Sequence, residues 1–332
     1  MRDLISLRET DADDLRLLLQ TAAAFGEILE RPVKKVPTLR GKTVVTLFYE
    51  ASTRTRTSFE LAAKYMSADA VNIAVAQSSV TKGESLKDTL RTIQSLTADC
   101  IVIRHASSGA AHMAALFADV PVINAGDGRH EHPTQGLLDI LTIWQHKVVG
   151  RQDETYPGAL ATDRAFDLSG LTVAIVGDIA HSRVARSNVW GLTKLGAQVR
   201  WCGPLTLLPA GAAELPVSVH TRLPEALEGA DVVMVLRLQT ERMEKGLLPS
   251  LREYARLWGI NARSLAHAKP DALVMHPGPL NRGVEISAEV ADGVGGIRVA
   301  IERQVRNGVA VRMAALYLLI GAQAGAAPVE EG

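Results

Sequence analysis

The stretch TVVTLFYEASTRTRTSFELAAKYM, residues 43–66, joins an apolar strand candidate to an apolar-faced helix candidate. Between them, residues 52–58 form an unbroken run of hydroxyl and guanidinium side chains. Such residues suit a helix N-cap and the solvent-exposed face of a helix, which is enough to explain one strand-to-helix junction of this kind. They also suit an anion, because the first turn of a helix presents N–H groups and the positive end of its dipole. The stretch therefore predicts a strand, an anion-binding turn and a helix.

Short apolar runs alternate with longer amphipathic segments along the rest of the chain. The strand candidates are 43–49, 70–75, 100–104, 120–124, 171–177, 197–203, 232–236 and 272–276. Strands that are apolar on both faces and separated by helices are typical of parallel sheets covered on both sides. We therefore predict an α/β protein with two domains, each a mostly parallel sheet flanked by helices.

The domain boundary is predicted near residue 150. Residues 150–170 lack periodicity and carry Gly, Pro and charge, whereas 133–147 have helical spacing and lead up to this passage. The domains are predicted at 1–149 and 150–297. A C-terminal helix, about 298–322, is predicted to pack back on the first domain.

Composition excludes several classes of protein. The chain of 332 residues has 36 basic and 36 acidic residues, so a generalised cationic surface for nucleic acid is not indicated. Cys100 and Cys202 stand apart in apolar stretches, which indicates buried packing and neither a disulfide framework nor a zinc site. The charged N-terminus lacks a signal-peptide core, and the uncharged stretch after Arg312 is shorter than a membrane span. We expect a cytoplasmic protein without nucleic-acid or membrane partners.

Polar side chains follow six of the strand candidates. In open parallel sheets, ligands bind beyond the carboxyl ends of the strands. The six groups are Ser52–Thr55, Arg104, residues 130–135, Gly177 with Arg183, Arg237 with Gln239, and residues 276–282. Helix capping explains one polar group at a strand end but not six of them, so the pattern favours a ligand site.

Two other chemistries are compatible with parts of the sequence. The run VAIVGDIAHSRVARS, residues 173–187, has the order of a dinucleotide site, but only Gly177 of the G-x-G-x-x-G set is present. His130-Glu131-His132 would suit half of a metal site. The chain offers no obvious further ligand at a matching strand end, and Pro133 places His132 near a helix N-cap.

Five motifs occur in order: S-T-R-T-R at 52–56, K-G-E at 82–84, H-P-T-Q at 132–135, R-L-Q at 237–239 and H-P-G-P at 276–279. In these motifs the chain closely resembles the catalytic chains of aspartate carbamoyltransferases, from about residue 4 to 320. The resemblance implies transfer of a carbamoyl group from carbamoyl phosphate to L-aspartate in pyrimidine biosynthesis. It implies no cofactor and no metal.

The resemblance also implies a donor site for carbamoyl phosphate. The residues that grip its phosphate are Ser52, Thr53, Arg54, Thr55 and Arg104. The groups that polarise its carbonyl oxygen are Thr55, Arg104 and His132. Its amide is expected near Gln135 and the backbone of Gly278 and Pro279, where Gly278 replaces a Leu of some relatives.

The implied acceptor site binds L-aspartate through Arg183, Arg237 and Gln239, with spacing favouring Arg183 over Arg186. Lys82 resembles the lysine of a mobile loop that a neighbouring subunit contributes in a homotrimer. Its serine partner is Ser78 or Ser79, and counting back from Lys82 favours Ser78. Glu50 and Arg242 match positions involved in domain closure.

Two rival functions share this fold. Ornithine carbamoyltransferases carry a Cys in the loop corresponding to 276–279 and an Asp with a Ser-Met-Gly run for the cationic acceptor. The present chain instead has H-P-G-P at 276–279 and R-L-Q at 237–239. Two arginines facing the acceptor suit a dicarboxylate and repel an ammonium group. A non-catalytic scaffold is expected to have lost site residues, whereas the motif positions are retained. The sequence leaves open whether a regulatory chain or a dihydroorotase partner joins the trimer.

Overall fold

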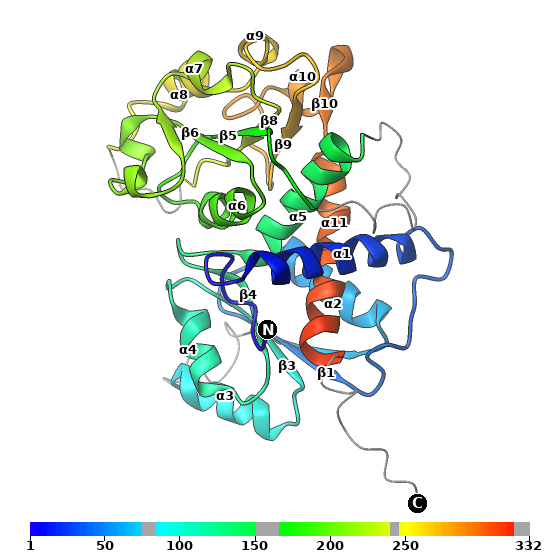
Figure 1. Ribbon diagram of the computed structural model, residues 1–332. Coiled ribbons are helices and arrows are strands. Elements are labelled where there is room, and N and C mark those ends of the chain that lie inside the picture. Colours follow the sequence, from blue (N-terminus) through cyan, green and yellow to red (C-terminus); the bar gives the residue numbers. More distant parts are fainter. Residues whose placement is uncertain (75–83, 151–165, 240–245, 322–332) are drawn as a thin grey trace, which may run out of the picture. The chain divides into compact units, whose positions relative to one another are not determined.

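The computed structural model describes residues 1–74, 84–150, 166–239 and 246–321, which form two compact units (Figure 1). Unit 1 holds Met1–Leu138 and the chain from Arg306 onward, and unit 2 holds residues 139–150 and Phe166–Val305. Each unit has its own sheet, and all strand pairs are parallel. The predicted α/β class with two helix-flanked parallel sheets is confirmed.

The sheet of unit 1 has the strand order β2-β1-β3-β4. Its strands are β1 (Thr43–Phe48), β2 (Asp69–Ala74), β3 (Cys100–His105) and β4 (Val122–Asp127). The helices that accompany them are α1 (Ala12–Ile28), α2 (Thr53–Tyr65), α3 (Leu86–Ser95) and α4 (Ala110–Phe117). Alternate strand residues such as Val45, Leu47 and Ile101 pack with α3 and α4 in one buried cluster. Because strand crossovers are right-handed, α2 covers the opposite face.

The sheet of unit 2 has the order β10-β9-β8-β5-β6-β7. Its strands are β5 (Thr172–Val176), β6 (Gln198–Cys202), β7 (Ser218–His220), β8 (Val232–Val235), β9 (Leu273–Met275) and β10 (Arg298–Val299). Its helices and turns are α6 (Arg183–Lys194), η5 (Leu205–Leu207), η6 (Ala212–Glu214), α7 (Leu223–Leu227), α8 (Leu251–Trp258), α9 (Ala262–Leu265), α10 (Ala288–Ala291) and η7 (Val294–Gly296). Side chains of α7, α10 and the strands share one buried apolar cluster.

Two helices contribute to both units. These are α5 (Pro133–Ile143), which continues as the π-helix η3 (Trp144–Val148), and α11 (Ile301–Leu316), which continues as the π-helix η8 (Tyr317–Gly321). The two compact units divide inside α5, after Leu138, and the predicted domain boundary near residue 150 stays a prediction. In unit 1, Arg312 of α11 lies over the ring of Phe59, 5.0 Å from its centroid. The C-terminal part of α11 thus belongs to the first unit.

Several local features differ from the predicted pattern. The C-terminal helix begins at Ile301 and not at 298, because Arg298–Val299 pairs with β9 as a short strand. The strands β7 and β10 were not predicted. Much of the predicted linker, 151–165, lies outside the described residues. Cys100 and Cys202 are free and buried, and burial raises the pKa of Cys202 to about 12.

Within the described ranges, none of the helices has both the length and the apolar character needed to cross a membrane.

Candidate active site

The first group of predicted site residues lies where β1 leads into α2. Ser52 is the N-cap of α2, with φ −160° and ψ 101°, and its side chain makes no capping hydrogen bond. Thr53 begins the helix, Arg54 is exposed and Thr55 is buried. The first turn of α2 contains no acidic residue. This end of the helix is therefore positive and presents N–H groups, which favours an anion.

Arg104 lies on β3, the strand beside β1. It is in register with Phe48, the last residue of β1, so it shares the carboxyl edge of the sheet with the turn that follows β1. Its Nη1 donates to the carbonyl of Ala125 at 3.1 Å, and its Nη2 lies 3.0 Å from Oε2 of Glu50. These contacts fix the plane of the guanidinium group. Glu50 thus pairs within unit 1, and its role in domain closure stays a prediction.

Both sheets reverse their strand order at the strands that precede predicted site residues. In unit 1 the chain runs from β1 outward to β2 and then returns to β3 on the other side of β1. In unit 2 it runs from β5 to β6 and β7, and then returns to β8 beside β5. Loops at such a reversal diverge and leave a crevice at the carboxyl ends, where α/β proteins bind their ligands. The fold therefore places a ligand-binding edge in each unit.

His132 is held by the turn between β4 and α5. It is buried, and its carbonyl accepts from the N–H groups of Gln135 at 2.9 Å and of Gly136 at 3.2 Å. The carboxylate of Asp127 organises the same turn, because it accepts from Glu131 N at 3.3 Å and lies 3.0 Å from Nδ1 of His130. Burial tends to raise the pKa of Asp127, but hydrogen bonds from His130 and Asn124 outweigh it and lower this pKa.

The hypothesis of a metal site at His130-Glu131-His132 is not supported by the geometry. His130 Nδ1 lies 3.0 Å from the Asp127 carboxylate, which raises the pKa of His130. Glu131 accepts instead from the backbone N–H of Leu7 at 2.8 Å. The side chains of His130 and Glu131 thus serve different partners, and no group of three or more potential metal ligands occurs among the residues that the structure describes.

Arg183 is positioned by the turn between β5 and α6. It is the first residue of α6, after the N-cap Ser182, whose Oγ accepts from Ala185 N at 3.1 Å. Its side chain is buried, whereas Arg186 is only half-buried. A buried guanidinium at the carboxyl edge of a sheet suits a carboxylate ligand better than a solvated surface arginine does. The structure thus favours Arg183 over Arg186 as the candidate.

The segment that carries Arg237 and Gln239 is fixed on both sides of Arg237. Leu236 donates its backbone N–H to Val176 O at 2.8 Å, and the side chain of Leu238 is fully buried. The backbone N–H of Gln239 donates to Oδ2 of Asp178 at 3.3 Å. Arg237 therefore stands on a backbone held by the sheet and by a buried carboxylate.

Asp178 was not predicted as a site residue, yet it connects the two arginine-bearing segments. Its Oδ1 lies 2.7 Å from Nδ1 of His181, just before Arg183, and its Oδ2 accepts from Gln239. The available signal was a carboxylate directly after an apolar strand. Gly177 before it has φ +133°, and a Cβ there would lie 2.9 Å from Leu236 O. This close approach of Leu236, the residue after β8, is a structural reason for a glycine at position 177.

The H-P-G-P motif forms a turn after β9. Gly278 donates its N–H to Nδ1 of His276 at 2.8 Å, and His276 donates its own N–H to Oε1 of Gln304 at 2.9 Å. Gly278 has φ +67°, a conformation that favours glycine, and a cis peptide bond joins it to Pro279. The turn belongs to unit 2, whereas Ser52–Thr55, Arg104, His132 and Gln135 belong to unit 1.

Some predicted residues lie outside the described part of the chain. These are Ser78, Ser79, Lys82 and Arg242. Their predicted roles stay predictions.

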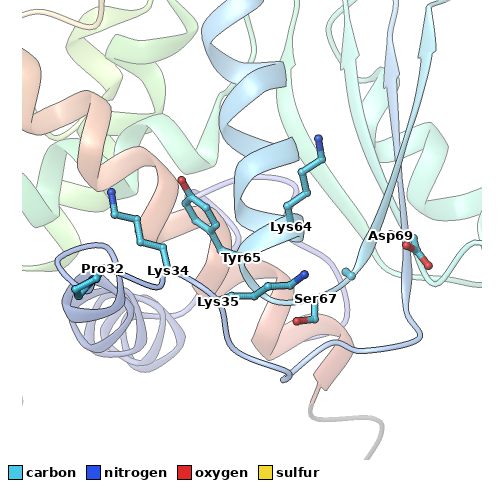
Figure 2. A pocket seen from close by; sticks show the side chains of 8 residues that line it. Pro32, Lys34, Lys35, Lys64, Tyr65, Ser67 and Asp69 are labelled. Atoms are coloured by element: carbon cyan, nitrogen blue, oxygen red, sulfur yellow. The ribbon is translucent and has the colours of Figure 1, made fainter.

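A surface pocket of unit 1 lies at the other end of α2 from Ser52. Figure 2 shows the side chains of Lys34, Lys35 and Lys64 around it, with Tyr65 nearby. The C-terminal end of a helix carries carbonyl groups and the negative end of the dipole, which lysines complement. The rise of about 1.5 Å per residue puts Lys64 about 16 Å along α2 from Thr53. The pocket is therefore separate from the predicted anion site.

Family models match both units of the chain. The model of the aspartate/ornithine carbamoyltransferase carbamoyl-P binding domain matches residues 2–145, and that of the Asp/Orn binding domain matches residues 169–319. The chain belongs to the aspartate/ornithine carbamoyltransferase family.

The chain is also similar to individual members of this family. The chain is 59% identical over 320 residues to the aspartate carbamoyltransferase catalytic subunit of Pelotomaculum thermopropionicum, covering 96% of this chain and 97% of the relative. A crystal structure of the Trypanosoma cruzi aspartate transcarbamoylase with carbamoyl phosphate and aspartate matches with a TM-score of 0.82 and 30% identity, over 96% of this chain and 97% of that one.

The fold is also shared with the ornithine carbamoyltransferase of Thermus thermophilus. That structure matches with a TM-score of 0.79 and 24% identity, over 96% of this chain and 99% of that one. The resemblance to aspartate carbamoyltransferases predicted from the motifs is confirmed by the family models and by the 59% identical relative.

Proposed function

We propose that this chain transfers the carbamoyl group of carbamoyl phosphate to the amine of L-aspartate, giving N-carbamoyl-L-aspartate and phosphate. The acceptor assignment depends on one observation. The segments that carry Arg183 and Arg237 are both bound to the buried carboxylate of Asp178, one through His181 and the other through Gln239. Two forked cations on a fixed backbone suit a ligand with two carboxylates.

The donor is bound by unit 1 in this proposal. Ser52, Thr53, Arg54 and Thr55 offer hydroxyl groups, N–H groups and a guanidinium to the phosphate at the positive end of α2. Arg104 and His132 polarise the carbonyl oxygen of the carbamoyl group, and Gln135, in the first turn of α5, binds the amide. Charge-assisted hydrogen bonds contribute about 1.5–3 kcal/mol each.

The reaction needs only positioning and charge stabilisation. The aspartate amine attacks the carbamoyl carbon, a tetrahedral oxyanion forms, and the C–O bond to phosphate then breaks. Arg104, His132 and Thr55 donate to the developing oxyanion, which is where fixed donors have their largest effect. The leaving phosphate accepts the proton of the amine, so no strong protein base is required. The product supplies pyrimidine biosynthesis.

A direct assay tests this assignment. Purified chain is supplied with carbamoyl phosphate and with L-aspartate, L-asparagine or L-ornithine, and the ureido product is measured. We expect L-aspartate to be much the best acceptor, because asparagine lacks one carboxylate and ornithine brings a cation to two arginines. Faster turnover of ornithine would show that the acceptor assignment is wrong. Turnover of none of them would favour a non-catalytic scaffold.

We also propose that the chain works as a cytoplasmic homotrimer in which Lys82, with Ser78, serves the site of a neighbouring subunit. The support is the K-G-E motif and, for the compartment, two free buried cysteines, as is usual where thiols stay reduced. Assembly with a regulatory chain or a dihydroorotase is left open.

Hybrid trimers test the shared site. Lys82→Ala and His132→Ala chains, each inactive alone, are dissociated, mixed and reassociated. We expect activity to return, because some sites then combine an intact Lys82 from one chain with an intact His132 from another. Mixed trimers, verified by mass, that stay inactive would place the loop in its own subunit.

A further inference from the structure

A buried chain of polar side chains leads from α5 to the H-P-G-P turn within unit 2. Asn188 Nδ2 donates to Oδ2 of Asp139 at 2.7 Å, and Gln304 Nε2 donates to Oδ1 of the same carboxylate at 2.7 Å. Gln304 Oε1 then accepts from the backbone N–H of His276 at 2.9 Å. Asn188 and Asp139 are fully buried, and Gln304 and His276 are 1% exposed. We name Asn188, Asp139 and Gln304 the relay.

The turn itself has a fixed hydrogen-bond pattern beyond the relay. The ring of His276 accepts the Gly278 N–H at Nδ1, so its own proton is on Nε2. That Nε2 lies 3.4 Å from Oε1 of the fully buried Glu285. Glu285 also accepts the backbone N–H of Asn281. The turn is therefore held at its start by the relay and along its length by His276 and Glu285.

We propose that Gln304 and Asp139 are positioning residues that aim the backbone carbonyls of this turn at the NH₂ group of carbamoyl phosphate. The inference rests on the proposed function, which assigns the backbone of Gly278 and Pro279 to that amide. A backbone carbonyl has no side-chain freedom, so its direction depends on how the turn is anchored. Loss of the anchor shifts the carbonyls, and displacements of about 1 Å have large effects on catalysis.

Each hydrogen bond of the relay has a fixed donor and a fixed acceptor, and this makes the relay testable. The His276 N–H is a donor, which fixes the oxygen of Gln304 toward the turn and its nitrogen toward Asp139. A Gln304→Glu change places two carboxylates face to face, and an Asp139→Asn change sets two donors against each other at one end. In the double variant, the carboxylate introduced at position 304 accepts from the His276 N–H and from the NH₂ of the amide introduced at position 139. The oxygen of that amide accepts from Asn188, so these three hydrogen bonds are restored with one of them reversed.

The measurement compares carbamoyl phosphate with acetyl phosphate, in which a methyl group replaces the NH₂ group. Gln304→Met, Gln304→Glu, Asp139→Asn and the double variant are purified, and Kd is measured for both compounds together with kcat for aspartate. We expect each single variant to weaken carbamoyl phosphate binding about tenfold and acetyl phosphate binding by about twofold or less, since only the former donates to the carbonyls. The double variant should recover most of the loss. Glu302→Ala, an exposed change on the same helix, should alter neither Kd.

The outcomes separate this inference from the proposed function. Failure of the unmodified chain to bind carbamoyl phosphate would overturn the function itself. If the unmodified chain is active, then equal losses for both phosphates, no loss, or a double variant no better than the single ones would each overturn the positioning role alone. Should a single variant not fold, the double variant still decides, because only restored hydrogen bonds predict a functional protein.

Discussion

Arg54→Ala is expected to lower kcat by about 10²-fold or more, comparable with the loss of one oxyanion donor. Arg54 stands in the first turn of α2, at the positive end of a helix whose first turn has no acidic residue. In the proposed site its guanidinium lies beside the bridging oxygen of the phosphate. Negative charge grows on that oxygen as the C–O bond breaks, so the interaction is stronger in the transition state than in the bound substrate.

Steady-state kinetics with saturating aspartate check this result. Lys64→Ala is the matched control, because it removes the same charge from the other end of the same helix and should leave kcat nearly unchanged. A normal kcat with only a raised KM for carbamoyl phosphate would show that Arg54 contributes to ground-state binding and not to the chemical step.

Arg237→Lys is expected to lower kcat/KM for aspartate by about 10²-fold or more, with carbamoyl phosphate binding nearly unchanged. A guanidinium holds a carboxylate through two parallel hydrogen bonds, and an ammonium group does not reproduce this geometry. The flanking Leu236 and Leu238 are anchored to the sheet and the core, so the backbone does not shift to bring a shorter cation into place. A substrate carboxylate left unpaired in a desolvated site costs several kcal/mol.

Arg222→Lys provides the comparison in the same unit. Arg222 pairs with Glu225 at 2.9 Å on an exposed surface, where either cation serves equally well. A matching loss of carbamoyl phosphate affinity in the Arg237→Lys chain would assign Arg237 to the donor instead of the acceptor. An unchanged kcat/KM for aspartate would remove Arg237 from the site.

The fold could be predicted largely because its strands are buried on both faces. Each apolar run, such as 171–177 and 232–236, overlaps a strand of the structure. The strands that were not predicted lack that signal. Arg298–Val299 is a two-residue strand, and Ser218–His220 is mostly exposed. Their pairing depends on a neighbouring strand distant in sequence, which no local pattern records.

The site could be predicted where a motif joins a strand end, and not where a side chain acts through a distant partner. Ser52–Thr55 and Arg237 follow strands beside a reversal of the strand order, and Arg104 lies near the end of such a strand, although their chemical roles stay predictions. Asp178 bonds to Gln239 across 61 positions, and Asp139 bonds to Gln304 across 165. A single buried Asp or Gln in a sequence gives no indication of such a partner.

Each sheet has its own reversal of strand order, so we expect the acceptor part of the proposed site to be able to change while the donor part is kept. The residues proposed to bind the donor lie mainly at the carboxyl ends of β1 and β3 in unit 1, whereas the arginines proposed for the acceptor come after β5 and β8 in unit 2. In the proposed site, we expect replacement of the loops that carry these arginines to alter which amino acid is carbamoylated and to leave phosphate binding by unit 1 unchanged. On this proposal, new acceptor specificity arises by exchange of short loops on an unaltered framework.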